Sequence, residues 1–279
     1  MTPKEMLETT NLNWSVRPET MVSESGIIIP GKIAMIREDT NTVLGVHSNG
    51  YVPYQNIELM ELLYKITQST GLILHSAGTF GDGKKVWIQL KSDDLKLGND
   101  TIKGYLSGIN SFDGSTNLAF GNANLTISCM NSFWVGYRKL DAKLRHTSSM
   151  KVRIEEILKN MDVLLENEKL IFNQIVRMNE IGITPKLKEM VKIQLFDLKK
   201  NYLTPELSKR KQNQIIKFED DLKTELNDKG ETLWGLFSGV TRFTTHTINK
   251  DATKNMENKM YGRVGNAERT IFHDISLIQ

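Results

Sequence analysis

Cysteine is almost absent from this sequence. Its 279 residues include one cysteine, Cys129, so the chain can form neither an internal disulfide nor a zinc site built from several cysteines. This composition suits a reducing compartment. Because Cys129 lies in an apolar stretch between Ser128 and Met130, we expect a buried structural thiol. A reactive thiol needs an electropositive and accessible setting.

Long apolar runs are also missing. No stretch approaches the roughly 20 apolar residues that a membrane-spanning helix needs. The first ten residues contain Glu5 and Glu8 and have no continuous apolar core, which is unlike a secretory signal peptide. We therefore expect a cytoplasmic protein with no membrane partner. The formal net charge is only +3, from 36 basic and 33 acidic side chains, and this balance alone indicates no particular partner.

The familiar catalytic motifs are lacking as well. The sequence contains no GxxxxGK[ST] phosphate loop, no GxSxG elbow and no HExxH pair. The glycine-containing segment 78–83 lies between two strand-like runs, so it predicts a hairpin turn and not a nucleotide cradle. The five histidines show no spacing typical of a metal site. We expect no enzymatic activity, no cofactor and no metal.

What the first half does contain is strand signals. Short or alternating apolar runs occur at 27–29, 33–37, 42–47, 51–54, 72–80, 84–91, 101–111 and 118–130. Asn49-Gly50 predicts a hairpin that joins 42–47 to 51–54, with Gly50 at positive φ. Gly81-Asp82-Gly83 predicts a second hairpin. Between them, an apolar stripe over 57–69 predicts one helix, which Gly71 ends.

The second half changes to helix signals. Apolar residues recur in steps of three and four from Ile154 to Met178, which predicts one long helix with a heptad-like seam. Thr184-Pro185 and Thr204-Pro205 each predict a helix start, and a last helix is expected over 232–248. The seam can pack inside the protein, which we favour, or form a contact with a partner.

These patterns predict an α+β protein. Its N-terminal antiparallel sheet has a hairpin, helix, hairpin layout, and a helical C-terminal half with one long helix follows. The expected parts are a leader at 1–25, attached through the indole of Trp14, a sheet core at 26–147, and a helical region at 148–279 packed on the core or extending from it.

Two clusters of basic and aromatic side chains are candidates for binding nucleic acid. Residues 134–153 contain six basic side chains, one acidic side chain and two aromatic rings, and single-strand binding uses both cations and aromatic faces. The second cluster is the hairpin at Lys84-Lys85, followed by Trp87. A solvated segment with no ligand is the alternative for both. A third basic stretch, 186–217, is expected to be helical, and we interpret it as a solvated helix face. The candidate residues are Lys84, Lys85, Trp134, Tyr137, Arg138, Lys139, Lys143, Arg145, Lys151 and Arg153.

A set of short motifs occurs in a fixed order along the chain. They include a Leu-Gly-Val-His-Ser-Asn-Gly-Tyr opening, an Asn-Ser-x-Asp-Gly-Ser segment and an Arg-His-Thr, and they lie at 44–56, 81–87, 110–115, 129–131, 145–147, 233–243 and 261–263. This ordered set resembles a phage- and plasmid-borne family that carries the domain of unknown function numbered 932. The resemblance covers roughly residues 42–275 and implies a protein of the cytoplasm of a bacterial host.

The same layout is similar, at the level of fold, to the single-strand annealing proteins of the RecT and Redβ class. This similarity implies a protein that binds single-stranded DNA without sequence preference, uses no ATP and acts as a homo-oligomer in phage or plasmid recombination. The alternative is a protein-interaction module, such as a host-takeover or anti-defence factor, with the long helix as its partner surface.

Overall fold

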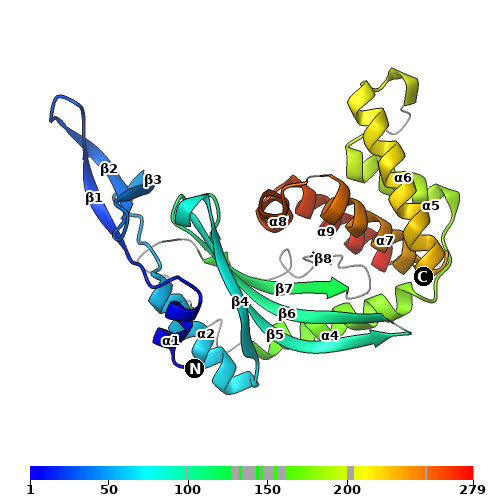
Figure 1. The fold of residues 1–279 in the computed structure, drawn as a ribbon, viewed down its shortest axis with the longest axis horizontal. Helices are drawn as coiled ribbons and strands as arrows, with labels where there is room; N and C mark the ends of the chain where they lie inside the picture. Colours follow the sequence, from blue (N-terminus) through cyan, green and yellow to red (C-terminus); the bar gives the residue numbers. More distant parts are fainter. Residues whose placement is uncertain are drawn as a thin grey trace. The chain divides into compact units, whose positions relative to one another are not determined.

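The structure is a computed structural model that describes residues 1–98, 100–126, 132–133, 143–144, 146, 154–155, 161–199, 204–248 and 250–278. The chain is an α+β protein with antiparallel strand pairing in its N-terminal part and helices in its C-terminal half (Figure 1). It divides into two compact units. Unit 1 consists of residues 1–92, 105–121 and 139–165, and unit 2 consists of residues 93–104, 122–138 and 166–279.

Two sheets organise the strands. The first has the order β1-β2-β3, and the second has the order β4-β5-β6-β7-β8, with β9 paired to β7. The strands are β1 (Val16–Val22), β2 (Ile28–Arg37), β3 (Thr42–Ser48), β4 (Ile73–Phe80), β5 (Lys85–Leu97), β6 (Asp100–Ser111), β7 (Leu118–Thr126), β8 (Ser132–Phe133) and β9 (Lys143–Leu144).

Unit 1 also contains the helices α1 (Pro3–Thr9) and α2 (Asn56–Thr70). The predicted apolar stripe of α2 is buried and shares one core cluster with Val86, Ile88 and Leu90 of β5. Gly71 ends α2 in the left-handed conformation, at φ 75°, as predicted. The segment 1–25 contains α1 and β1, and its Trp14 is buried in the same core cluster.

The expected 42–54 hairpin is wrong. Strand β3 pairs with β2, residues 51–54 form no strand, and Gly50 is not among the glycines at positive φ. The Tyr51 N–H donates to the Ser48 carbonyl, and the Tyr51 hydroxyl donates to the Ser111 carbonyl oxygen at 2.8 Å. These bonds hold Tyr51 beside the 110–115 segment, so the chain does not return along β3.

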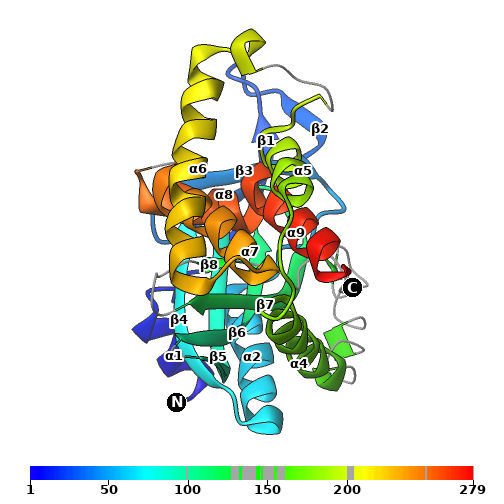
Figure 2. The same cartoon turned by 90° about the vertical axis from the view of Figure 1, so that its right-hand side faces the viewer.

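Unit 2 contains the helical half. Its helical elements begin with the larger part of α4 (Met161–Met178) and continue with α5 (Pro185–Phe196), η3 (Thr204–Glu206), α6 (Lys209–Lys229), α7 (Leu233–Arg242), the π-helix η4 (Phe243–Thr247), α8 (Ala252–Tyr261) and α9 (Arg263–Ser276). Helix α7 packs against α6 and α9 (Figure 2). This packing needs small residues, because a Cβ added to Gly239 of α7 would lie 2.7 Å from a Leu222 side-chain atom of α6.

The predicted helix starts and the predicted seam agree only in part with the structure. Thr184 caps α5 as expected, but Thr204-Pro205 starts only a short 3-10 turn, and α6 begins one turn later, capped by Ser208. The seam residues Ile171, Ile175 and Met178 are buried in the core of unit 2. This part of the seam therefore packs internally. The described helix, α4, covers 161–178, and residues 156–160 lie outside the described residues.

Candidate nucleic-acid interface

Strand β5 presents a line of basic, aromatic and amide side chains on the face away from its buried core residues. Val86, Ile88 and Leu90 are fully buried, and the residues between them point to the opposite face because strand side chains alternate. This second set, which we call the β5 stripe, consists of Lys85, Trp87, Gln89 and Lys91. All four side chains are half-buried. At about 3.3 Å per residue, the stripe is roughly 20 Å long.

Within this stripe, the Trp87 ring packs on Gly78 of the neighbouring strand, and we call this position the seat of Trp87. Trp87 pairs across the ladder with Gly78 of β4, and a Cβ added to Gly78 would lie 2.8 Å from Cζ2 of the indole. The missing side chain of Gly78 therefore makes room for the Trp87 ring against the β4 backbone. Gln89 is tied to the same strand, because its Oε1 accepts a hydrogen bond from Ser76 Oγ at 3.1 Å. The register fixes both side chains.

The far end of the stripe brings a cation to a pair of rings. Lys91 Nζ lies 5.5 Å from the centroid of the Tyr105 ring, within the range of a cation–π contact. The ring of His75, in the irregular register of β4, lies 4.9 Å from the same Tyr105 ring. His75 is exposed and Tyr105 is buried, so His75 is the more accessible ring at this end.

The near end of the stripe is the hairpin turn. Lys84 is exposed directly after the turn, and its carbonyl accepts a hydrogen bond from the Phe112 N–H at 2.7 Å. Lys85 follows as the first residue of β5. The structure thus places the predicted residue Lys85 on the same strand as Trp87, and Lys84 directly before that strand.

The other predicted site residues lie almost entirely outside the described residues. These are Trp134, Tyr137, Arg138, Lys139, Arg145, Lys151 and Arg153. For Lys143 only the backbone is described, and it pairs with Ala119 of β7. Cys129 also lies outside the described residues.

A second feature of unit 1 is a stack of three rings. The rings of His47 and Tyr51 are nearly parallel, with centroids 3.8 Å apart. The ring of His146 also stacks on Tyr51, at a centroid distance of 4.9 Å. Nε2 of His47 is 2.8 Å from the Phe112 carbonyl oxygen. The stack therefore holds His146 and the residues after β3 against the 110–115 segment. We call it the ring stack.

The ring stack is electrically neutral at its centre. Burial, and to a smaller extent the charge of Asp113, raises the pKa of the Tyr51 phenol. Burial lowers the pKa of His146 to about 4. A neutral phenol and a neutral imidazole suit a structural clamp better than a proton-transfer site, which works best with a pKa near the operating pH.

One family matches most of this chain. The model of a domain of unknown function, DUF932, matches residues 43–264. The chain belongs to the DUF932 family. No curated protein and no solved structure matches it. In this DUF932 chain, the segments 44–56 and 110–115 that carried the sequence resemblance meet at the ring stack, together with His146 of the Arg-His-Thr motif.

Sequence reasoning missed most of this DUF932 site. The alternation of apolar and polar residues over 84–91 could have predicted the whole stripe, because Gln89 and Lys91 continue the pattern of Lys85 and Trp87. His75 and Tyr105 could not be found in this way, because they lie on neighbouring strands and no local pattern connects them to β5. The ring stack was missed because its three segments are distant in sequence. The only hint in the sequence was that all three segments belong to the motifs that carry the family resemblance.

Two further properties concern the described part of the chain. It contains no helix that combines the length and the apolarity required to cross a membrane. Within the same residues, no three histidine, cysteine or carboxylate side chains lie close enough together to hold a metal ion.

Proposed function

We propose that this protein binds single-stranded DNA along the β5 stripe and anneals complementary strands without ATP, as a homo-oligomer in phage or plasmid recombination. The observation that carries the proposal is the seating of Trp87 on Gly78 within a line of lysines. An indole held on a sheet surface offers a face for any base, because every base has a π-face.

The charges of the stripe suit the same ligand. Lys85 and Lys91 flank Trp87 on the same face of one strand, and Lys84 adds a cation at the turn. Cations on both sides of an aromatic ring can hold the phosphates of the nucleotides before and after the stacked base. Sheet surfaces with aromatic rings also bind single-stranded RNA in other folds, so the comparison of DNA with RNA belongs in the test.

The basic cluster at 134–153 is the second part of the proposal. It rests on composition alone, since its candidate side chains lie outside the described residues. If Arg138, Lys139, Lys143 and Arg145 each hold a phosphate, replacing all four with Ala reduces the slope of log K against log salt by up to about 3.

The decisive experiment measures binding of oligo-dT across a salt series. Trp87→Ala should weaken binding by about 1–3 kcal/mol, while Trp87→Phe should retain part of the affinity because it keeps an aromatic face. Lys85→Gln and Lys91→Gln should each reduce the slope of log K against log salt by about 0.7. Lys65→Gln, which removes an exposed lysine of α2, is the matched control and should change neither quantity.

Annealing is tested separately, with two complementary labelled strands and no nucleotide. The wild-type protein should accelerate their pairing, and Trp87→Ala should do so less. A folded Trp87→Ala variant with wild-type affinity and wild-type annealing would refute the assignment of the stripe.

A further inference from the structure

The hairpin formed by β1 and β2 ends in an exposed apolar tip. Strand β3 pairs with β2 only over Lys32 to Arg37, so residues 21–31 form a two-stranded ribbon that extends away from α1 and α2 (Figure 1). At its end lie three exposed aliphatic side chains: Val22 is 56% exposed, Ile27 68% and Ile28 62%. We call residues 21–29 the tip.

The tip exposes more apolar surface than is usual for a region that contacts only solvent. A two-stranded ribbon is marginally stable by itself, and three large aliphatic side chains grouped at its end gain nothing from solvent. Glu24 is the only charged residue of the tip. Grouped exposed apolar side chains with few charges indicate a surface that another protein covers.

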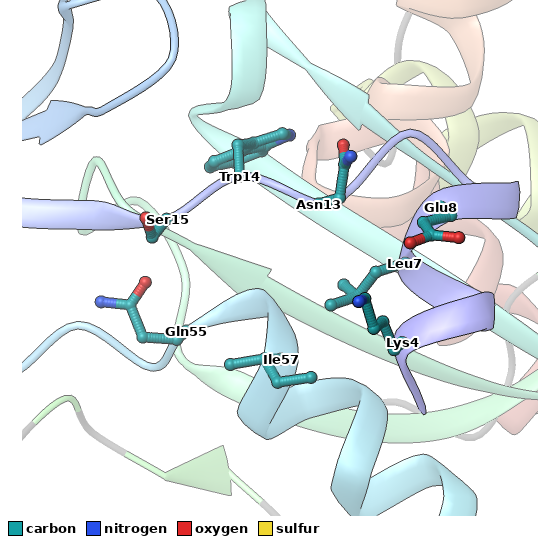
Figure 3. A pocket seen from close by; sticks show the side chains of 8 residues that line it. All are labelled: Lys4, Leu7, Glu8, Asn13, Trp14, Ser15, Gln55 and Ile57. Carbon is teal, nitrogen blue, oxygen red and sulfur yellow. The ribbon is translucent and has the colours of Figure 1, made fainter. Parts of the chain in front are cut away.

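Unit 1 also has a pocket with both apolar and polar walls. It has a volume of about 360 Å³ and is lined by Lys4, Leu7, Glu8, Asn13, Trp14, Ser15, Gln55 and Ile57. Leu7 and Lys4 of α1 point toward Ile57 of α2 across it (Figure 3). Ile57 is 39% exposed, so the pocket contains apolar surface that is open to a ligand.

The tip cannot reach the pocket of its own chain. Ser15, at the edge of the pocket, directly precedes β1, and Val22 lies seven residues further along this strand. At about 3.3 Å per residue, the extended strand separates them by roughly 23 Å. The ladder between β1 and β2 keeps the strand extended. A tip that enters this pocket must therefore come from another copy.

We propose that the tip of one copy occupies the pocket between α1 and α2 of the next copy. The aliphatic side chains of Ile27 and Ile28 then pack against Leu7 and Ile57. Lys4 of the pocket can pair with Glu24 of the tip, whereas Glu8, which also lines the pocket, has the same charge as Glu24. Gln55 does not compete for the tip, because its amide already pairs with both the N–H and the carbonyl of Val16.

This contact joins two different surfaces. A head-to-tail contact of this kind generates closed rings or open filaments and not only dimers. It specifies the contact behind the proposed homo-oligomer and is independent of the DNA-binding part of that proposal, since neither the tip nor the pocket contains a residue of the β5 stripe. The test is therefore made without nucleic acid.

Sedimentation velocity over a wide concentration range is the measurement, with circular dichroism as the folding control. The wild-type protein should form assemblies larger than dimers. The tip variant, Ile27→Asp with Ile28→Asp, and the pocket variant, Ile57→Asp, should both be monomeric. Ile216→Asp on α6, at a side chain that is 56% exposed, is the matched control and should assemble like the wild type.

Mixing the two monomeric variants gives the sharpest result. One contact remains possible between an intact tip and an intact pocket, so an equimolar mixture should form dimers and nothing larger. Glu24→Lys should weaken assembly, and adding Lys4→Glu should restore it. The proposal is overturned by a wild type that stays monomeric, by a tip variant that still assembles, or by a mixture that stays monomeric.

Discussion

The guanidinium carbon of Arg37 lies 4.3 Å from the ring centroid of Trp14. Trp14 also contacts Phe112, with ring centroids 5.6 Å apart, and Arg37 Nη1 donates to the Asp82 carbonyl at 3.0 Å. The indole thus attaches the first residues of the chain to unit 1, as its position in the sequence predicts. Through the Arg37–Asp82 hydrogen bond, this cluster also contacts the turn between β4 and β5, and β5 carries the stripe.

The first prediction concerns Gly83 in that turn. Gly83 has φ 104°, and a Cβ there would lie 3.1 Å from atoms of both Trp14 and Arg37. Gly26 also has positive φ, at 80°, but an added Cβ would meet nothing within 4 Å. Both Gly→Ala variants cost about 1 kcal/mol for the backbone, and Gly83→Ala should cost clearly more. Urea unfolding checks this, and equal losses for the two variants would contradict it.

Local patterns predicted the elements whose signals are local. The stripe of α2, its end at Gly71, the 81–83 turn and the Thr184 cap all depend on residues within a few positions of one another. The 42–54 hairpin failed because the Asn-Gly turn signal competes with a distant contact, the bond from Tyr51 to Ser111. Helices α8 and α9 were not predicted, and their polar buried residues weaken the apolar pattern.

The site was predicted only where it follows a single strand. Lys84, Lys85 and Trp87 are neighbours in sequence, so composition could group them. Tyr105 joins them through the neighbouring strand β6, and His75 joins through an irregular register in β4. Such partners follow from strand pairing, which periodicity within one strand does not determine.

The second prediction tests the seat of Trp87 by a double-mutant cycle. In wild-type protein, Gly78→Ala should lower the free energy of unfolding, because the new methyl group meets the indole at 2.8 Å. In a Trp87→Ala background, the same change should be neutral or stabilising, since Ala suits a strand better than Gly. Chemical denaturation of the four proteins gives the coupling energy. Additive effects would show that the indole does not lie on Gly78.

The third prediction concerns the pH dependence of the ring stack. The pKa of His146 is about 4 in the folded protein and about 6.5 in an unfolded chain. The unfolded chain therefore binds the proton first, so this histidine's contribution to stability is present above pH 6.5 and is lost as the pH falls toward 4. The loss is at most about 3 kcal/mol.

His146→Phe isolates this contribution from the other titrating groups. Phenylalanine keeps a ring beside Tyr51 but cannot take up a proton. Between pH 6.5 and 4 the free energy of unfolding should fall less steeply in the variant than in the wild type. Parallel curves for the two proteins would show that His146 is protonated equally in both states.

The last prediction concerns a buried ion pair in unit 2. Lys259 of α8 and Glu268 of α9 are each 1% exposed, and Lys259 Nζ lies 2.8 Å from Glu268 Oε1. The π-helix η4 supplies further partners, because Nζ lies 2.7 Å from Thr245 Oγ1 and 3.2 Å from Thr244 Oγ1. Burial lowers the pKa of Lys259, and the charge of Glu268 opposes this change.

Removing one charge of this pair should cost more than removing both. Lys259→Met leaves a buried carboxylate without its cation, which costs about 3–5 kcal/mol. Lys259→Met combined with Glu268→Leu removes both desolvated charges and should recover most of that stability. Urea unfolding of the wild type and the two variants checks this order, and a double variant less stable than Lys259→Met would contradict the argument.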